Sequence, residues 1–460
     1  MTRRSLVVAG FALLLITILV ACTWLSPTGV DTMSSNRLRK VEIVLTEEIT
    51  DAILAELEGY GKITGQYGRI KGVTMDLRDS MVQEVSALPY VDAIGEQAER
   101  FAHDYSDGIS TWDHDIINIT EFLASRAVDY SGEGVYVAVL DTGLVKNWRD
   151  YLPADQMAVQ YAKAFAGGGG DNLNVSEPAN LWERDTDSHG THVASTILGY
   201  FLNLFGVTVN GAAPAAEVIP VKVLNNSGFG WSSMIAEGIL YIADLKGRIG
   251  APMVINMSLG GPVDSPLEKG AIRYAVEQGV IVVASAGNEG EAGMGYPGAY
   301  PVVISVGSAG WTGEWTSGSW WQGFGIAEPV PVDQIYVSNF SSRELGELEQ
   351  ELDVLAPGSW IVGPYLAYGA AHPPLWASGQ PGEYYFLGGT SMAAPHVAGL
   401  AALMLQKDSL LVQEDVEELL ITNTIPVPPG SAWVDGVLYE WGSDATGAGL
   451  VQAELVLEAI

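Results

Sequence analysis

Short, almost uninterrupted apolar runs recur in the long C-terminal part of the chain and predict buried strands. Residues 135–140 read Val-Tyr-Val-Ala-Val-Leu, and residues 281–284 read Ile-Val-Val-Ala. Strands buried on both faces of a parallel sheet have this composition, whereas a half-exposed strand alternates apolar and polar residues. Helical spacing of apolar residues follows at 392–405, 415–420 and 450–460. The pattern predicts an α/β fold, a doubly wound parallel sheet with helices on both faces.

A different pattern precedes this region. Residues 41–45 alternate, 47–58 have helical spacing, 61–66 and 69–76 resemble strands, 79–87 a helix and 90–94 a last strand. The order β-α-β-β-α-β is that of a ferredoxin-like unit. We therefore expect a small α+β domain before the parallel sheet, ending near residue 100.

The first candidate catalytic group ends the strand predicted over 135–140. The chain continues Asp141-Thr142-Gly143, which puts a carboxylate at the carboxyl end of a parallel strand, where α/β sheets place their sites. A turn Asp followed by Gly is a simpler explanation of the same residues. Asp-Thr-Gly is also the signature of aspartic proteases, which need two such carboxylates. Because no second copy or Asp-Ser-Gly occurs, only a homodimer could supply that pair.

A candidate base follows in Asp187-Ser188-His189-Gly190-Thr191-His192. His189 stands where a helix is expected to begin, with small residues behind it that let another element pack closely. The two histidines could instead bind a metal, but two histidines three apart without a Glu between them make a poor zinc helix. We interpret His189 as the base and His192 as a packed core residue.

The candidate nucleophile lies in Gly389-Thr390-Ser391-Met392-Ala393-Ala394-Pro395-His396. A serine hydroxyl is a weak nucleophile and needs a base and donors for the developing oxyanion. Ser391 opens the helical pattern over 392–405, so backbone N–H groups and the positive end of the helix dipole face its substrate. An ordinary Ser/Thr N-cap is the alternative. Asn288, after the strand at 281–284, could supply a second oxyanion donor from its side-chain amide.

The order of the motifs separates the possible enzyme classes. α/β-hydrolases run Ser, Asp, His and chymotrypsins run His, Asp, Ser, whereas this chain runs Asp, His, Ser. With its four motifs in order, the chain resembles the subtilisin-like serine proteases (peptidase S8) over roughly residues 106–460. The resemblance implies a triad of Asp141, His189 and Ser391, an oxyanion residue Asn288, and a serine endopeptidase that works through an acyl-enzyme.

The same resemblance implies a substrate groove between two strands. Ser258-Leu259-Gly260 looks like the strand that pairs with substrate backbone, and Gly228 and Gly230 look like the opposite wall, as in β-augmentation. Gly295 looks like the floor of a deep S1 pocket that prefers a large apolar or aromatic P1 residue. Glu289 could tolerate a basic P1 residue at its rim, and Leu259 and Ile235 are candidates for an apolar P4 pocket.

Residues 37–105 resemble an inhibitor I9-type propeptide, which chaperones folding and inhibits its own enzyme. The linker reads Phe101-Ala102-His103-Asp104-Tyr105-Ser106. Since a pocket floored by Gly295 accepts an aromatic residue, we predict self-cleavage between Tyr105 and Ser106, with Phe101 as the second choice. The catalytic domain would then span 106–460.

The N-terminus predicts export. Residues 6–21 are almost all apolar and follow Arg3 and Arg4, as in a secretory signal. The run ends at Leu19-Val20-Ala21-Cys22, which resembles the lipobox of bacterial lipoproteins. It implies a signal peptide over 1–22 with a lipobox-like end, in which Cys22 is acylated after cleavage. A plain signal peptide or an uncleaved membrane anchor are the alternatives. Residues 23–36 form a polar tether, and with one cysteine in the chain no internal disulfide can form. We expect a secreted protein or a membrane-anchored lipoprotein.

Composition narrows the partners. The net charge is −33, and 12 Lys and Arg oppose 41 Asp and Glu from residue 106 onward, which leaves −29 on the catalytic part. Nucleic acid is excluded as a partner because phosphate binding needs basic patches. We expect protein or peptide substrates, a monomer, no cofactor for catalysis, and a possible structural Ca²⁺ whose ligands the resemblance places, loosely, at Asp107, Asp150 and Asn203.

Two aromatic-rich stretches, 311–337 and 362–385, depart from the family pattern. They could extend the groove or contact a partner, or they could cover each other. Two other functions remain open at this point. A non-catalytic binding protein would need a broken triad, and a tethered zymogen permanently inhibited by its prodomain would await another protease.

Overall fold

The computed structural model describes residues 38–68, 71–96, 110–121, 126–166, 181–202, 207–315, 321, 326–348, 350–365 and 384–460. The chain divides into two compact units between residues 103 and 104. Cys22, Tyr105, Ser106, Asp107 and Asn203, to which the sequence assigns processing, lipidation or calcium binding, lie outside the described residues. No helix within those ranges is both long and apolar enough to cross a membrane.

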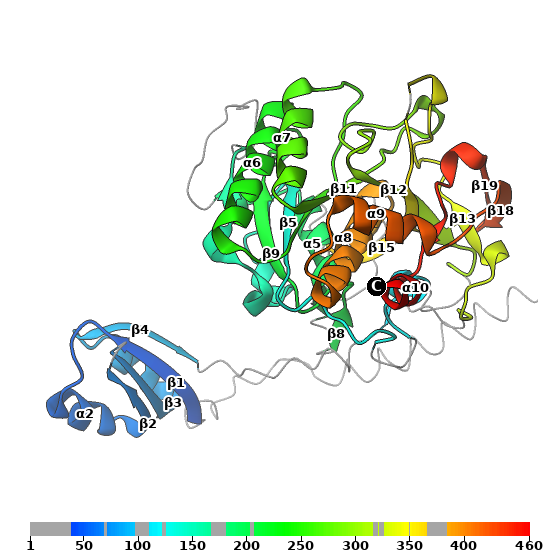
Figure 1. Cartoon of the computed structure of the whole chain (residues 1–460). Coiled ribbons are helices and arrows are strands. Elements are labelled where there is room, and N and C mark those ends of the chain that lie inside the picture. The colour runs from blue at the N-terminus through cyan, green and yellow to red at the C-terminus, as the bar shows by residue number, and fades with distance from the viewer. Residues whose placement is uncertain are drawn as a thin grey trace, which may run out of the picture. The chain divides into compact units, whose positions relative to one another are not determined.

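The first unit is a four-stranded antiparallel sheet with two helices (Figure 1). Its elements are β1 (Leu38–Leu45), α2 (Asp51–Glu58), β2 (Gly61–Tyr67), β3 (Gly72–Arg78), α3 (Asp79–Ser86) and β4 (Val91–Glu96). Alternate residues of β1, Val41, Ile43 and Leu45, are buried with Leu57 of α2 and Val85 of α3. The order β2-β3-β1-β4 is that of the expected ferredoxin-like unit.

The second unit is built on a ten-stranded, mostly parallel sheet with the order β17-β20-β14-β12-β11-β10-β5-β9-β6, with β13 beside β12. Its central strands are β5 (Tyr136–Asp141), β9 (Glu217–Lys222), β10 (Met253–Met257), β11 (Val280–Ser285), β12 (Ile304–Trp311) and β14 (Val354–Pro357), and each pairs in parallel with its neighbour. At the edges lie β6 (Lys163–Ala164), β13 (Ile335–Val337), β17 (Thr424–Ile425) and β20 (Leu450–Val451).

Helices cover both faces of this sheet, as the continuous apolar runs predict. Along β5, Val137 and Val139 enter one core cluster, whereas Ala138 and Leu140 enter the other. The first cluster packs against α5 (His189–Leu198), α8 (Thr390–Lys407), α9 (Gln413–Thr422) and α10 (Ala453–Ala459), and the second against α6 (Ser232–Ile249) and α7 (Pro266–Glu277). Figure 1 shows α6 and α7 side by side on one face.

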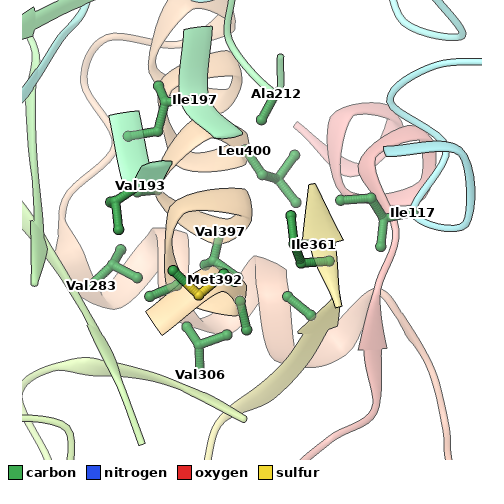
Figure 2. Packing of buried hydrophobic residues seen from close by; sticks show 14 of the residues in the cluster. Ile117, Val193, Ile197, Ala212, Val283, Val306, Ile361, Met392, Val397 and Leu400 are labelled. Carbon is green, nitrogen blue, oxygen red and sulfur yellow. The ribbon is translucent and has the colours of Figure 1, made fainter. Parts of the chain in front are cut away.

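The helix that carries Ser391 is buried along most of its length, because α8 is rich in Ala, Gly and Leu and packs against α5 and the sheet. Figure 2 shows Met392, Val397 and Leu400 of α8 among Val193 and Ile197 of α5, Val283 of β11 and Val306 of β12. A polar helix could not be held in this position. The packing fixes where the N-terminus of α8 points, and therefore where Ser391 lies.

Three antiparallel pairs complete the described elements: β7 (Gly199–Leu202) with β8 (Val207–Asn210), β15 (Ile361–Pro364) with β16 (Tyr384–Leu387), and β18 (Gly430–Val434) with β19 (Val437–Trp441). A short helix α4 (Trp112–Asp115) opens the described part of this unit. The helix predicted over 450–460 begins at Ala453, because Leu450 and Val451 pair with β14 and β17 as β20 instead.

The described aromatic residues of the two divergent stretches are packed inward. Trp311 and Trp321 are buried, and Trp315 makes edge contacts with Trp360 and Phe386. Because Trp360 and Phe386 lie outside the two stretches, these contacts partly bury Trp315 without pairing the stretches with each other.

Candidate active site

Asp141 and His189 meet at the carboxyl end of the sheet. β5 ends at Asp141, α5 begins at His189, and Nδ1 of His189 lies 2.9 Å from Oδ1 and 3.0 Å from Oδ2 of Asp141. The carboxylate is fully buried, whereas the His189 side chain keeps 24% of its surface exposed. An imidazole held at Nδ1 by a buried carboxylate has its other nitrogen free to exchange a proton with a ligand.

A glycine makes this close approach possible. A methyl group at Gly190 would lie 2.4 Å from the carbonyl oxygen of Gly143 and 3.1 Å from Oδ1 of Asp141. Any larger residue at that position would push the first turn of α5 away from the end of β5. The backbone N–H of Gly190 also donates to the hydroxyl of Thr142 at 3.0 Å, which ties the two segments together.

A buried carboxylate that the sequence did not single out holds the loop before His189. Asp185 accepts hydrogen bonds from the hydroxyl of Thr142 at 2.8 Å and from the backbone N–H groups of Asp187 and Ser188 at 2.9 and 2.8 Å. Ser188 adopts φ of 80°, which a non-glycine residue takes only where its surroundings impose it. The Asp185 contacts supply that constraint and set the direction in which His189 leaves the loop.

Lys222, at the end of β9, is a buried lysine close to Asp185. Its ammonium group donates to the carbonyl of Thr142 and, at 2.8 Å, to Oδ1 of Asn226. Burial raises the pKa of Asp185, and the charge of Lys222 partly opposes that rise, leaving a value of about 6.

The electrostatics of the site favour the protonated form of His189. Burial alone would lower the pKa of His189, but the charge and the hydrogen bond of Asp141 raise it. The charges of Asp187 and Asp185 act in the same direction, and the pKa reaches about 9. Since the base must be neutral to accept a proton, activity should increase as the pH rises toward this value.

Ser391 lies in the first turn of α8, and the end of β10 holds it there. The hydroxyl of Ser258 donates to the carbonyl of Ser391 at 2.7 Å, and the hydroxyl of Ser391 donates to the carbonyl of Ser258 at 3.2 Å. The Ser391 hydroxyl thus has to turn from this carbonyl before it can give its proton to a base. Attack on a substrate requires that rotation.

Asn288 and the backbone of Ser391 face one small space. The N–H of Thr390 donates to Oδ1 of Asn288 at 2.9 Å, which leaves the amide nitrogen Nδ2 to donate elsewhere. A methyl group placed on Gly389 would lie 3.6 Å from Nδ2 of Asn288 and 3.7 Å from the backbone nitrogen of Ser391. Two donors around one atom-sized space can stabilise an oxyanion.

A pocket of about 760 Å³ opens beside His189. Of the predicted groove residues, Gly228, Gly230, Ser258, Leu259 and Gly260 line it, as do Ile235 and His189. Gly295 does not line this pocket. Its neighbour Tyr296 does, and pairs with Gly261 through hydrogen bonds of 2.8 and 2.9 Å between their backbones. A deep S1 pocket above Gly295 stays a prediction.

Two other histidine and carboxylate assignments can be compared with the structure. His192 is fully buried and its Nε2 lies 3.1 Å from the carbonyl of Ile361, so it is a core residue as predicted. The carboxylate of Glu289 accepts hydrogen bonds from the backbone of Asn288 and the hydroxyl of Ser342, and its place at the rim of an S1 pocket stays a prediction. Asp150 accepts one from Asn147 at 3.2 Å, and the calcium site stays a prediction.

The parts assembled here define a class of enzyme. An imidazole oriented by a buried carboxylate, a serine at a helix N-terminus and two convergent N–H donors are what acyl transfer by a serine hydrolase requires. The model of the subtilase family (peptidase S8) matches residues 132–450, and the chain belongs to this family. It is a serine endopeptidase.

Relatives of known sequence and structure agree. Subtilisin NAT of Bacillus subtilis subsp. natto is 32% identical over 366 residues, which are 78% of this chain and 77% of that protein. Subtilisin of Bacillus pumilus is 35% identical over 303 residues, 65% of this chain and 86% of that protein. The structure of sphericase matches with a TM-score of 0.54 and 28% identity over 77% of this chain and 99% of its own.

Proposed function

We propose that this serine endopeptidase is made as a proenzyme, exported, and held at a membrane surface through lipid on Cys22. It hydrolyses peptide bonds with Ser391 as nucleophile, His189 as base and Asp141 as the group that orients the base. The observation that carries the proposal is the Asp141–His189 pair beside the pocket, with Nδ1 and Oδ1 2.9 Å apart. The ferredoxin-like first unit supports the propeptide assignment of residues 37–105.

In the proposed mechanism a substrate strand lies between Gly228–Gly230 and Ser258–Gly260, which places its carbonyl near Ser391. The Ser391 hydroxyl turns from the carbonyl of Ser258, and His189 takes its proton as the oxygen attacks. Nδ2 of Asn288 and the N–H of Ser391 hold the oxyanion. His189 then gives its proton to the leaving amine, and water repeats the sequence on the acyl-enzyme.

The test is intact mass and N-terminal sequencing of the full chain after expression in a bacterial host, wild type beside Ser391→Ala. A wild-type product that begins at Ser106, absent from the mutant, supports self-cleavage after Tyr105. Processing that survives in Ser391→Ala contradicts it. An unprocessed chain in both, with an acylated Cys22 at its start, supports instead a tethered zymogen that another protease activates.

A further inference from the structure

Three buried side chains meet beneath the nucleophile helix, away from the proposed triad. Asp113 and His114 belong to α4, and His396 lies on α8 five residues after Ser391. Asp113 is 4% exposed, His114 3% and His396 0%. One potential ligand atom from each lies within 4.8 Å of the other two.

Each of the two histidines bonds a backbone carbonyl through one ring nitrogen, and its other ring nitrogen faces the carboxylate of Asp113. Nδ1 of His396 lies 2.8 Å from the carbonyl of Met392, and Nε2 of His114 lies 3.1 Å from the carbonyl of Thr196. A carbonyl only accepts, so each of these nitrogens carries the proton of a neutral imidazole. Nε2 of His396 and Nδ1 of His114 then point their lone pairs toward Oδ2 of Asp113, at 3.0 and 3.2 Å.

Two imidazole lone pairs that face one carboxylate need a proton or another cation between them and the oxygen. The Thr111 hydroxyl, 3.0 Å from Nδ1 of His114, can satisfy one of the histidines. The contact between Asp113 and His396 still lacks a proton unless one of them takes an additional one. The interior offers further polar atoms, since Thr196 Oγ1 and the Tyr200 hydroxyl are buried without a hydrogen-bond partner among the described residues.

The dimensions suit zinc. Nitrogen and oxygen ligands about 2.0 Å from a tetrahedral zinc lie about 3.3 Å from each other. The two separations from Asp113 are close to this, at 3.0 and 3.2 Å, and the two histidine nitrogens lie within 4.8 Å of each other. Histidines that bind metals characteristically donate their other N–H to a carbonyl or carboxylate, as both do here. We propose that Asp113, His114 and His396 bind a divalent transition metal, zinc by the nature of its ligands, which fastens α4 to the helix of Ser391.

Cobalt and zinc binding to the full chain carrying Ser391→Ala, which prevents autolysis, tests this proposal. After removal of metal with a chelator, one equivalent of Co²⁺ should give the visible absorption of a tetrahedral site with nitrogen ligands, and Zn²⁺ should displace it. Zn²⁺ should also raise Tm, whereas Ca²⁺ should not displace the Co²⁺, because it prefers oxygen ligands.

His114→Gln and Asp113→Asn, each in the Ser391→Ala chain, should lose the Co²⁺ absorption, and Asp115→Asn, a buried acid on the same helix, should keep it. The proposal is wrong if the parent chain gives no Co²⁺ absorption at one equivalent, or if the absorption persists in both variants. Because the parent chain decides the first point, a variant that does not fold leaves the proposal testable.

A second inference rests on the proposed function and concerns the other end of the substrate pocket. Glu268, in the first turn of α7, is 4% exposed, lines the pocket, and its Oε1 has no hydrogen-bond partner among the described residues. The sequence Ser265-Pro-Leu-Glu268 would form a capping box if Glu268 bonded back to the N–H of Ser265. That N–H donates to the hydroxyl of Tyr300 instead, at 2.8 Å, so the carboxyl is not used as a cap.

Apart from His189, the ionisable side chains that line the pocket are all acids. Its described lining contains the carboxyl groups of Asp187, Asp264 and Glu268, and no Lys or Arg. Asp264 accepts a hydrogen bond from Tyr300 at 2.9 Å, whereas Oε1 of Glu268 is buried and has no hydrogen-bond partner among the described residues. We infer that Glu268 selects a substrate with a lysine or arginine at P4, the subsite that the family resemblance assigns to Leu259 and Ile235.

Two peptide substrates that differ only by lysine or norleucine at P4 test the inference with the processed enzyme. The ratio of kcat/KM for lysine over norleucine should be at least tenfold in the wild type. In Glu268→Gln the ratio should fall close to one, while Asp264→Asn should retain it. Burial and then the charge of Asp264 raise the pKa of Glu268 to about 7, so the preference should weaken below that pH.

Equal cleavage of both peptides by the wild type, or an unchanged ratio in Glu268→Gln, overturns the assignment of Glu268 and leaves the proposed function intact. Failure to cleave either peptide after processing would instead contradict the proposed function. The two failures are therefore distinguishable in one experiment.

Discussion

Two aspartate–histidine pairs of nearly equal geometry lie in opposite surroundings. Asp141 meets Nδ1 of His189 at 2.9 Å at the mouth of the pocket, and Asp113 meets Nε2 of His396 at 3.0 Å in the interior. The His189 side chain is 24% exposed, and that of His396 is fully buried. The distance between the partners is thus no guide to what such a pair does.

Access to a ligand makes the difference. His189 lines a pocket, so it can accept a proton from a bound ligand, and the carboxylate of Asp141 then stabilises the imidazolium that forms. The other nitrogen of His396 is bonded to the main-chain carbonyl of Met392, so no substrate can reach it. In this buried position only a proton or a metal ion could bind between His396 and Asp113. The first pair suits catalysis, whereas the second suits a fixed structural link.

The largest effect on activity should come from the pair beside the pocket, Asp141 and His189. Asp141→Asn keeps the shape of the site but removes the charge that orients and stabilises the His189 imidazolium. We expect kcat to fall by about 10⁴, the magnitude known for this exchange in serine proteases. Steady-state kinetics on the processed enzyme measure it, with circular dichroism as the control for folding. A fall in kcat of less than tenfold would contradict the assignment of Asp141 to the triad.

Asn288→Ala should have the next largest effect. Its amide is held toward the space beside Ser391 by the Thr390 N–H, at 2.9 Å from Oδ1. We expect kcat to fall by about 10²–10³ with little change in KM, which is the loss already known for such a donor in subtilisin itself. A change confined to KM would mean that Asn288 binds substrate rather than the transition state.

The buried pair of Asp113 and His396 should affect stability more than catalysis. Asp113→Ala leaves two buried imidazoles without their hydrogen-bonding partner, and a buried polar group left unsatisfied costs about 1–3 kcal/mol. Urea unfolding of the chelator-treated chain, in the Ser391→Ala background, measures the free energy of unfolding. The exposed control Asp155→Asn should change it by less than about 0.5 kcal/mol. Equal values for the two variants would show that the pair carries no stability.

The smallest effect should appear in the pH profile. The pKa of His189 is raised to about 9, in part by the charge of Asp187. Because neutral His189 is the active form, kcat/KM should fall as the pH drops below that value. Asp187→Asn removes a negative charge, lowers the pKa of His189 and should move the acidic limb to lower pH. Asp264→Asn, in the same pocket, should leave the limb in place, and equal profiles for all three proteins would contradict the attribution.

Local patterns predicted the elements and the residues that end or begin them. The apolar runs located β5 and β11, and the glycines and small residues around His189 and Ser391 marked tight helix starts. The supporting groups were missed because their partners are remote in sequence. Asp113 and His396 are 283 positions apart and Thr142 and Asp185 are 43 apart, so no periodicity or short motif connects them.

The pocket shows the same limit. Gly228, Gly230 and Ser258 were predicted from a family resemblance, and they line it. Glu268 was overlooked because its sequence suggests a capping box, and only the bond from Ser265 to Tyr300 shows that it is not one. Choosing between two uses of one carboxyl group requires the position of a third residue.

The position of the nucleophile in the chain has a consequence for biosynthesis. Asp141 and His189 leave the ribosome before Ser391, which lies on a helix that must pack between α5 and the sheet before its donors face the substrate. Contacts between such distant segments form late and slowly in folding. A chain in which α8 has not yet packed therefore has no complete nucleophile site, and the protease stays inactive until these distant segments have met.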